Sequence, residues 1–177
     1  ATVLVLDLVK YGVHFACHRL PWLWRVHQVH HSDPDFDVST AARAHPMEVL
    51  LIQGSVMTTI LLLAPPPAAV FVAELMACFQ SFFEHANAAL PAWAEQALRP
   101  WIVTPDLHRV HHTNKVWEQQ HNLGEIFPWW DRLFGTYCEQ PRDANSAWTP
   151  GLVGLQGPRM VEVSFLLKEP LDTPPAT

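Results

Sequence analysis

The histidines of this chain are grouped at spacings that suit metal binding. The sequence has 177 residues and 11 histidines. Eight of them form one HxxxH motif and two HxxHH motifs: His14 and His18; His27, His30 and His31; His108, His111 and His112. On a helix, residues three and four positions apart lie on one face, so each motif would point its imidazoles in one direction. The pattern predicts a metal site built from several helices.

The number and type of these residues narrow the choice of metal. Eight clustered imidazoles exceed the four ligands of one tetrahedral zinc ion, which implies two metal ions. Imidazole binds zinc, iron, copper and nickel. The three cysteines show no CxxC spacing, so a thiolate zinc site is not indicated. Carboxylate-bridged di-iron bundles need two ExxH motifs, and only one is present, at Glu118–His121. An all-histidine site beside a membrane suits iron that activates O2.

Two apolar runs separate the first histidine motifs from the last. Residues 46–64 and 68–83 are apolar, and Pro65, Pro66 and Pro67 lie between these runs. A helix of that length measures about 25–28 Å, close to the roughly 30 Å of a hydrocarbon core. Because proline interrupts a helix, we expect a transmembrane helical hairpin over residues 46–83. Its two ends emerge on one side, so all histidines lie on the same face of the bilayer.

Charge gives the expected orientation. Basic residues accompany the histidine motifs, whereas the proline turn carries no charge. The positive-inside rule therefore places the histidine side in the cytoplasm. We predict an all-α, multi-pass integral membrane protein: a membrane-embedded helical bundle with a cytosolic helical cap that carries the histidine motifs. The alternative is a soluble helical protein with a buried hairpin, since apolar runs this short also occur in soluble cores.

Two further features of the composition bound the function. The formal net charge is −6, and no basic patch is visible, which argues against a nucleic-acid partner. The chain begins inside an apolar run, residues 1–13, without a methionine or the features of a signal peptide. We therefore expect residues 1–13 to be the end of a longer helix whose first part is missing.

Several segments beyond the histidine motifs also have a recognisable pattern, and together they resemble the fatty acid hydroxylase superfamily, also called the sterol desaturase family. Phe15 is a departure, because members often have arginine at this place. Members are also usually longer at the N-terminus. The resemblance covers residues 11–137 and is carried by these segments: 21–32, like the second histidine box; 42–46, like the R-x-H-P element; 84–87, like the H-x-N element; 104–112, like the third box; and 122–124 with 130–137, like the family's ending.

The resemblance implies an O2-dependent enzyme with two iron ions that hydroxylates or desaturates a C–H bond of a lipid, such as a sterol or a fatty acyl chain. Electrons would come from an external donor, a cytochrome b5-like or ferredoxin-like protein. Residues 1–137 would be the catalytic domain and residues 138–177 a proline-rich C-terminal tail. The alternative function is a metal-binding membrane protein without oxygenase activity, either an inactive family member or a zinc-loaded scaffold.

Site residues follow from the motifs and the resemblance. We predict that the eight motif histidines, His85 and His121 are metal ligands. A second set is predicted to support the ligands from behind: His45, Asn87, Asn122, Asp106 and Asp131. Each has a plainer alternative: His45 as a helix start, the asparagines as cap or turn residues, Asp106 as a helix cap and Asp131 as an ion-pair partner of Arg132.

Overall fold

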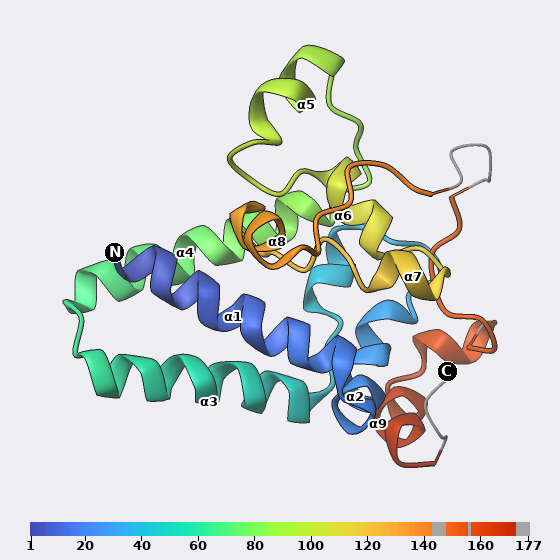
Figure 1. The fold of residues 1–177 in the computed structure, drawn as a ribbon. Coiled ribbons are helices and arrows are strands. Elements are labelled where there is room, and N and C mark those ends of the chain that lie inside the picture. The colour runs from blue at the N-terminus through green and yellow to red at the C-terminus, as the bar shows by residue number, and fades with distance from the viewer. Residues whose placement is uncertain (143–147, 156, 173–177) are drawn as a thin grey trace.

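The computed structural model of the chain describes residues 1–142, 148–155 and 157–172, and in these ranges the protein is built from helices (Figure 1). No strand forms among the described residues, apart from two isolated bridges. The prediction of an all-α fold is confirmed. The elements are α1 (Thr2–Arg19), α2 (Pro21–His31), η1 (Val38–Ala42), α3 (Pro46–Leu63), α4 (Pro67–Glu84), α5 (Ala92–Leu98), α6 (Pro105–His111), α7 (Val116–Gln119), α8 (Trp129–Phe134), η2 (Pro158–Val161) and α9 (Val163–Asp172).

The predicted hairpin is present as α3 and α4, each 18 residues long. Ala64 ends α3 in the left-handed conformation, with a φ of 44°. Pro67 is the first residue of α4, a position where a missing N–H costs no hydrogen bond. Both helices are long and apolar enough to cross a membrane, yet only 11% of α3 and 22% of α4 is buried. Their outer faces therefore expose large apolar side chains, among them Leu50, Leu61, Leu62, Phe71 and Phe79.

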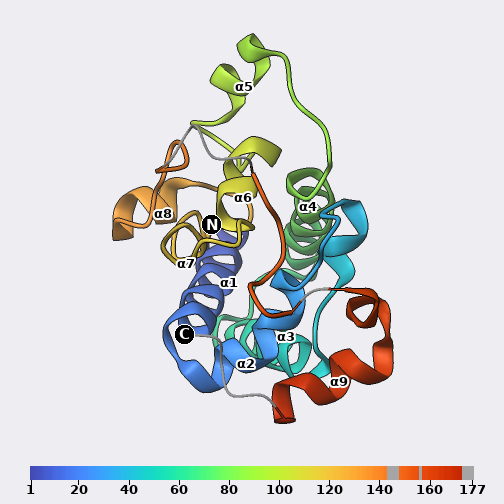
Figure 2. The same cartoon turned by 90° about the vertical axis from the view of Figure 1, so that its right-hand side faces the viewer.

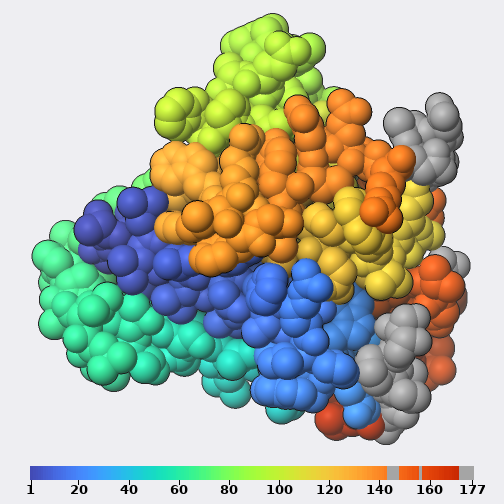
Figure 3. Space-filling view, viewed as in Figure 1, coloured from blue at the N-terminus to red at the C-terminus, as the bar shows by residue number. Residues whose placement is uncertain are grey.

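Helix α1 lies along the hairpin and contacts both of its helices (Figure 1). The space-filling view shows α1 beside α3 (Figure 3). Leu6 of α1, Val56 of α3 and Ala73 of α4 form a buried apolar cluster. Nearer the histidines, the Lys10 ammonium group lies 3.1 Å from a Glu74 carboxylate oxygen. Residues 1–13 were expected to be the end of a longer helix; residues 2–13 belong to α1, which continues through the first histidine motif to Arg19.

Helices α2, α6, α7 and α9 lie at the open end of the hairpin, opposite its turn, whereas α5 projects away from it (Figures 1 and 2). The C-terminal segment covers α2 from outside: the Gln28 side-chain amide donates to the Glu169 carboxylate over 2.7 Å. The Trp148 Nε1–H also donates to the Arg109 carbonyl over 2.8 Å, and the Arg43 guanidinium group donates to the Met160 carbonyl, so both stretches of the predicted tail, 148–155 and 157–172, contact the body of the protein. Residues 143–147, 156 and 173–177 of that tail lie outside the described residues.

Candidate metal centre

Each histidine motif lies at the C-terminal end of a helix whose start is set by local sequence. The HxxxH motif ends α1. Pro21 is the first residue of α2, and the first HxxHH motif ends that helix. The Thr104 hydroxyl accepts a hydrogen bond from the Leu107 amide and caps α6, where Pro105 is the first residue. The starts of α2 and α6 are thus set by a proline in the first turn and, for α6, by the Thr104 cap.

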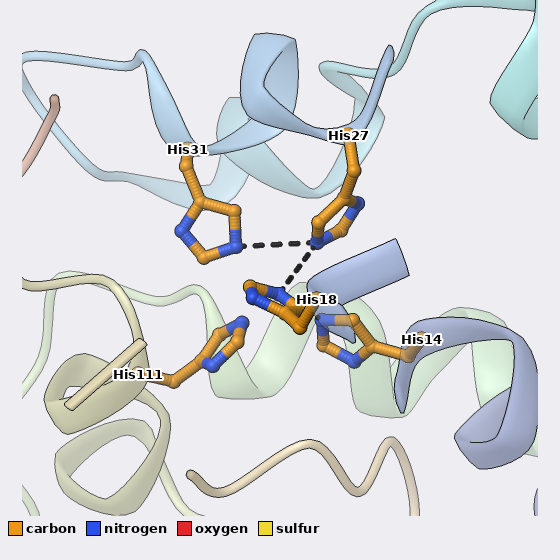
Figure 4. Close-up of side chains that lie close together, drawn as sticks. All are labelled: His14, His18, His27, His31 and His111. Atoms are coloured by element: carbon orange, nitrogen blue, oxygen red, sulfur yellow. Dashed lines mark hydrogen bonds between the residues drawn. The ribbon is translucent and has the colours of Figure 1, made fainter. Parts of the chain in front are cut away.

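Five imidazoles from α1, α2 and α6 converge on one point (Figure 4). The facing Nε2 atoms of His18 and His27 are 2.9 Å apart, and His27 Nε2 is 3.2 Å from His31 Nε2. The five-histidine group offers one ligand atom from each residue, and these atoms all lie within 4.8 Å of one another: His14, His18, His27, His31 and His111.

A second set of imidazoles lies beside the first. His108 Nε2 is 3.1 Å from both His85 Nε2 and His112 Nε2. The rings of His31 and His112, one from each set, are stacked with centroids 4.5 Å apart. The four-histidine group comprises His30, His85, His108 and His112, and its ligand atoms also lie within 4.8 Å of one another.

These two groups fit metal ions in their donor chemistry. Burial lowers the pKa of His27 and of His85 to about 3 and that of His30 to about 4. The imidazoles are therefore neutral at physiological pH, which is the form that binds metals. His111 Nε2 is buried without a hydrogen-bond partner among the described residues. A buried lone pair without a donor is costly, and a metal ion at the centre of the group would satisfy it.

The rear nitrogens of some of the imidazoles are held by the protein, whereas Nδ1 of His18, His31 and His108 is buried without a hydrogen-bond partner among the described residues. In the four-histidine group, His30 Nδ1–H donates to the Arg43 carbonyl over 3.2 Å, and His85 Nδ1–H donates to the Ser81 carbonyl over 2.7 Å. A proton fixed on Nδ1 leaves the Nε2 lone pair free for a ligand bond. The tautomer of these rings is thus set by the fold.

Glu48 is a site residue that the sequence reasoning missed. Its Oε1 lies 2.6 Å from His27 Nδ1, and both side chains are buried. A carboxylate behind a metal-binding imidazole raises the basicity of the ligand. Its signal in the sequence was an acidic residue in the first turn of an apolar helix, three positions after His45, since such residues are often functional.

His121 and His45 lie outside both groups. His121 Nδ1–H donates to the Trp117 carbonyl over 2.7 Å, and its ring packs on the Trp117 ring. His45 caps α3, because its Nδ1 accepts a hydrogen bond from the Met47 amide. The structure therefore supports the helix-start alternative for His45 and does not bring the His121 ring to the metal groups.

The other four predicted supporting residues divide into two pairs. Asp106 and Asn87 both accept from the Arg109 guanidinium group, each over 3.1 Å, and neither is bonded to an imidazole of the groups. Asn122 and Asp131 instead make hydrogen bonds that position segment 121–124: the Asn122 side chain donates to the Leu107 carbonyl, and the Asp131 carboxylate accepts from the Leu123 amide. This segment lies directly behind the five-histidine group. The alternative for Asp131 is not what the structure shows, because the Arg132 guanidinium group lies over the Tyr137 ring.

A cavity of about 250 Å³ separates the histidines from the hairpin. Its apolar lining from α1 and α3 includes Val13, Val49 and Ile52, and the same two helices also contribute Lys10 and Gln53. Its polar wall includes five of the grouped histidines and the buried carboxyl group of Glu84, whose Oε1 is 3.9 Å from His108 Nε2. The cavity thus connects imidazoles of both metal groups with the helices that expose apolar surface.

The chain belongs to the fatty acid hydroxylase family, whose model matches residues 1–136. The resemblance inferred from the motifs is therefore confirmed. No solved structure matches the chain significantly.

Among curated proteins, it is similar to ornithine lipid hydroxylase OlsE of Rhizobium tropici, with 32% identity over 149 residues, which are 81% of this chain and 44% of that protein. Alkylglycerol monooxygenase of Homo sapiens is 30% identical over 74% of this chain and 28% of its own length. Cholesterol 25-hydroxylase of Mus musculus is 24% identical over 78% of this chain and 46% of its own length. The chain spans less than half of each of these relatives, and all three are lipid hydroxylases or monooxygenases by name.

Proposed function

We propose that this chain is the catalytic part of a membrane-embedded, O2-dependent di-iron enzyme that hydroxylates a lipid. The observation that carries the proposal is the pair of adjacent histidine groups, five and four imidazoles with converging Nε2 atoms, at the wall of a cavity beside two apolar helices. Nine neutral imidazoles suit two metal ions, and imidazole is a usual ligand for iron. Residues 1–137 would form this catalytic unit.

The two iron ions would be held by the five-histidine and the four-histidine groups, and when bound they would supply the activation of O2. The chain's own part is positional. The Nδ1 hydrogen bonds orient the imidazoles, and burial keeps water away from the side where the cavity meets the ligands. Val49 and Ile52 would hold the hydrocarbon part of the substrate near His30 and His85, which line the same cavity.

The exposed apolar faces of α3 and α4 support the membrane part of the proposal. A soluble core helix would be mostly buried, whereas these helices are mostly exposed. Exposed apolar surface of this extent is characteristic of a membrane or protein interface. In this arrangement the hairpin crosses the bilayer, the histidine groups lie on the cytoplasmic side, and the substrate reaches the cavity from the lipid phase. The reducing electrons come from a separate donor protein.

Hydroxylation is favoured over desaturation by the names of the relatives, which are hydroxylases and monooxygenases. Their named substrates, an ornithine lipid, an alkylglycerol and cholesterol, are all lipids with a polar group. We extend that class, a lipid with a polar head and a long hydrocarbon part, to this chain. A cavity lined by both apolar and polar side chains is consistent with such a molecule.

Metal content and product formation test the proposal together. The protein would be purified in detergent, reconstituted anaerobically with Fe2+, and analysed for iron alongside His111→Ala and His121→Ala. We expect about two irons per wild-type chain, fewer in His111→Ala, and no loss in His121→Ala, because that ring lies outside both groups.

Lipid extracts of cells that express the chain under 18O2 would then be compared with those of the His111→Ala cells. A lipid that gains one labelled oxygen only with the unaltered chain supports the hydroxylase. Tightly bound zinc that iron does not replace, with no O2 uptake, would contradict it and favour the metal-binding scaffold.

A further inference from the structure

The segment His121–Gly124 presents two backbone carbonyls to the back of the five-histidine group. The His121 carbonyl accepts from His111 Nδ1–H over 2.9 Å, and the Leu123 carbonyl accepts from His14 Nδ1–H over 2.9 Å. These two imidazoles come from α6 and α1, which are distant in the sequence. One short segment therefore sets the ring orientation and the tautomer of ligands from two helices.

Asp131 fixes the end of this segment that faces His14. Its fully buried carboxylate accepts from the Leu123 amide over 2.7 Å and from the Gly124 amide over 2.8 Å. The same carboxylate also accepts from the Thr136 hydroxyl over 2.6 Å. Gly124 is required by this close approach, since an added Cβ would lie 2.9 Å from Asp131 Oδ2 and 2.8 Å from the Phe127 carbonyl oxygen.

Asn122 fixes the middle of the segment. It adopts the left-handed conformation, with a φ of 56°. Its buried side-chain amide donates to the carbonyls of Leu107 and Cys138 and accepts from the Cys138 amide. Because all these groups are buried and bonded, the two carbonyls that face the imidazoles have little freedom to move.

The four-histidine group does not use this segment. Its two rear hydrogen bonds among the described residues go to the carbonyls of Arg43, before α3, and Ser81, on α4. The supports of the two groups are thus separate, although the groups themselves are adjacent. Segment 121–124 accepts hydrogen bonds from two imidazoles of the five-histidine group and, among the described residues, from none of the four-histidine group.

We propose that Asp131 is a positioning residue that controls metal affinity at the five-histidine group alone, through the Leu123 carbonyl and His14. The inference rests on the proposed two-metal function and deepens it, because it predicts that the two ions can be separated by a substitution that removes no ligand. In Asp131→Asn the shape is kept, but an amide N–H2 replaces one acceptor oxygen and faces a backbone N–H. The segment should then shift, and His14 with it.

The test is an anaerobic Fe2+ titration of the detergent-purified full chain against a competing chelator. In the wild type both ions bind. In Asp131→Asn we expect one of the two ions to bind about 10- to 100-fold more weakly, the range found when groups behind metal ligands are changed, while the other keeps its affinity. The matched control is Asp106→Asn, an equal change in a carboxylate that pairs with Arg109 outside the segment, and it should alter neither ion.

Ligand variants assign the affected ion. In a His112→Ala background, which weakens the four-histidine group, Asp131→Asn should remove most of the remaining binding; in a His111→Ala background it should add little. Thr136→Val, which removes one partner of Asp131, should act in the same direction with a smaller shift and serves if Asp131→Asn does not fold.

The outcomes are distinct. Wild-type protein that binds no iron would refute the proposed function. Two ions in the wild type with unchanged affinities in both Asp131→Asn and Thr136→Val, or equal weakening of both ions, would refute only the positioning role of Asp131.

Discussion

Replacement of Glu48 tests how far the protein tunes its own ligands. The Glu48 carboxylate lies 2.6 Å from His27 Nδ1, with both side chains about 95% shielded from solvent. A buried hydrogen bond to a charged group contributes about 1.5–3 kcal/mol, which corresponds to a factor of roughly 10 to 150 in a binding constant. Glu48→Gln keeps an acceptor oxygen but loses the charge, so we expect the lower end of that range, about tenfold weaker binding at the five-histidine group.

The assay for this prediction is again Fe2+ titration against a chelator, with thermal unfolding of the metal-free protein in parallel. Glu74→Gln is the matched control, because Glu74 lies in the same hairpin and pairs with Lys10 rather than with a histidine. It should leave both ions in place. Less than a twofold change in Glu48→Gln would show that the carboxylate only packs against the ring, and the reasoning about ligand basicity would then fail.

Three further predictions follow from the site. The metal-free protein should lose stability as the pH falls from about 6.5 toward 3. The histidines of the unfolded state take up protons near pH 6.5, whereas His27 and His85 in the folded state have a pKa of about 3. Urea unfolding at pH 7.5 and 5.5 measures the free energy of unfolding, and equal values at the two pH values would contradict the prediction. Gly124→Ala should lower iron content at the five-histidine group, since its Cβ would meet Asp131 Oδ2 at 2.9 Å; unchanged iron content would show that the segment yields. Val49→Trp should fill the cavity and reduce lipid product while leaving iron content unchanged; normal product formation would place the substrate elsewhere.

The sequence predicted the histidine groups well because a helix converts spacing into direction. Three and four residues are close to one turn, so histidines at these spacings lie near one face of the helix. The prediction that each motif points all its rings in one direction is nevertheless wrong for the two HxxHH motifs, because His30 and His111 belong to the other group from the remaining histidines of their motifs. The starts of α2 at Pro21 and of α6 after the Thr104 cap also depend on local residues. The hairpin was readable from its length and its prolines. These features depend on residues near one another in the chain.

His121 shows where local reasoning reached its limit. With Glu118 it has ExxH spacing, which would put both side chains on one helical face. Helix α7 ends at Gln119, however, so His121 lies beyond it. Glu118 is buried and accepts from the Arg142 amide instead. His121 contributes to the site through its backbone carbonyl, which accepts from His111. Every residue type has this carbonyl, so the sequence could not indicate the contact.

The support of the site depends on contacts that only the tertiary fold creates. The Glu48 carboxylate contacts the His27 imidazole, 21 positions away in the sequence. The Asp131 carboxylate accepts hydrogen bonds from the backbone amides of Leu123 and Gly124. The docking of α9 on α2 was likewise not visible in a segment that reads as a proline-rich tail. Such contacts join residues with no common spacing, so no periodicity reports them.

The two HxxHH motifs share their histidines between the groups in opposite ways. In α2, His27 and His31 belong to the five-histidine group, and His30 to the other. In α6 and its cap, His108 and His112 belong to the four-histidine group, and His111 crosses to the first. Neighbouring residues on a helix differ by about 100° in direction, so the last two histidines of each motif, at positions four and five, belong to different groups.

That exchange has a mechanical consequence. Each helix gives two ligands to one group and one ligand to the other, so both helices are part of both sites. The separation of the two groups is therefore set by helical geometry, which is stiff, whereas the orientation of individual rings is set by loop carbonyls and by Glu48. Substitutions behind the rings should change the affinity of one ion, but only changes that move α2 against α6 should alter the distance between the two.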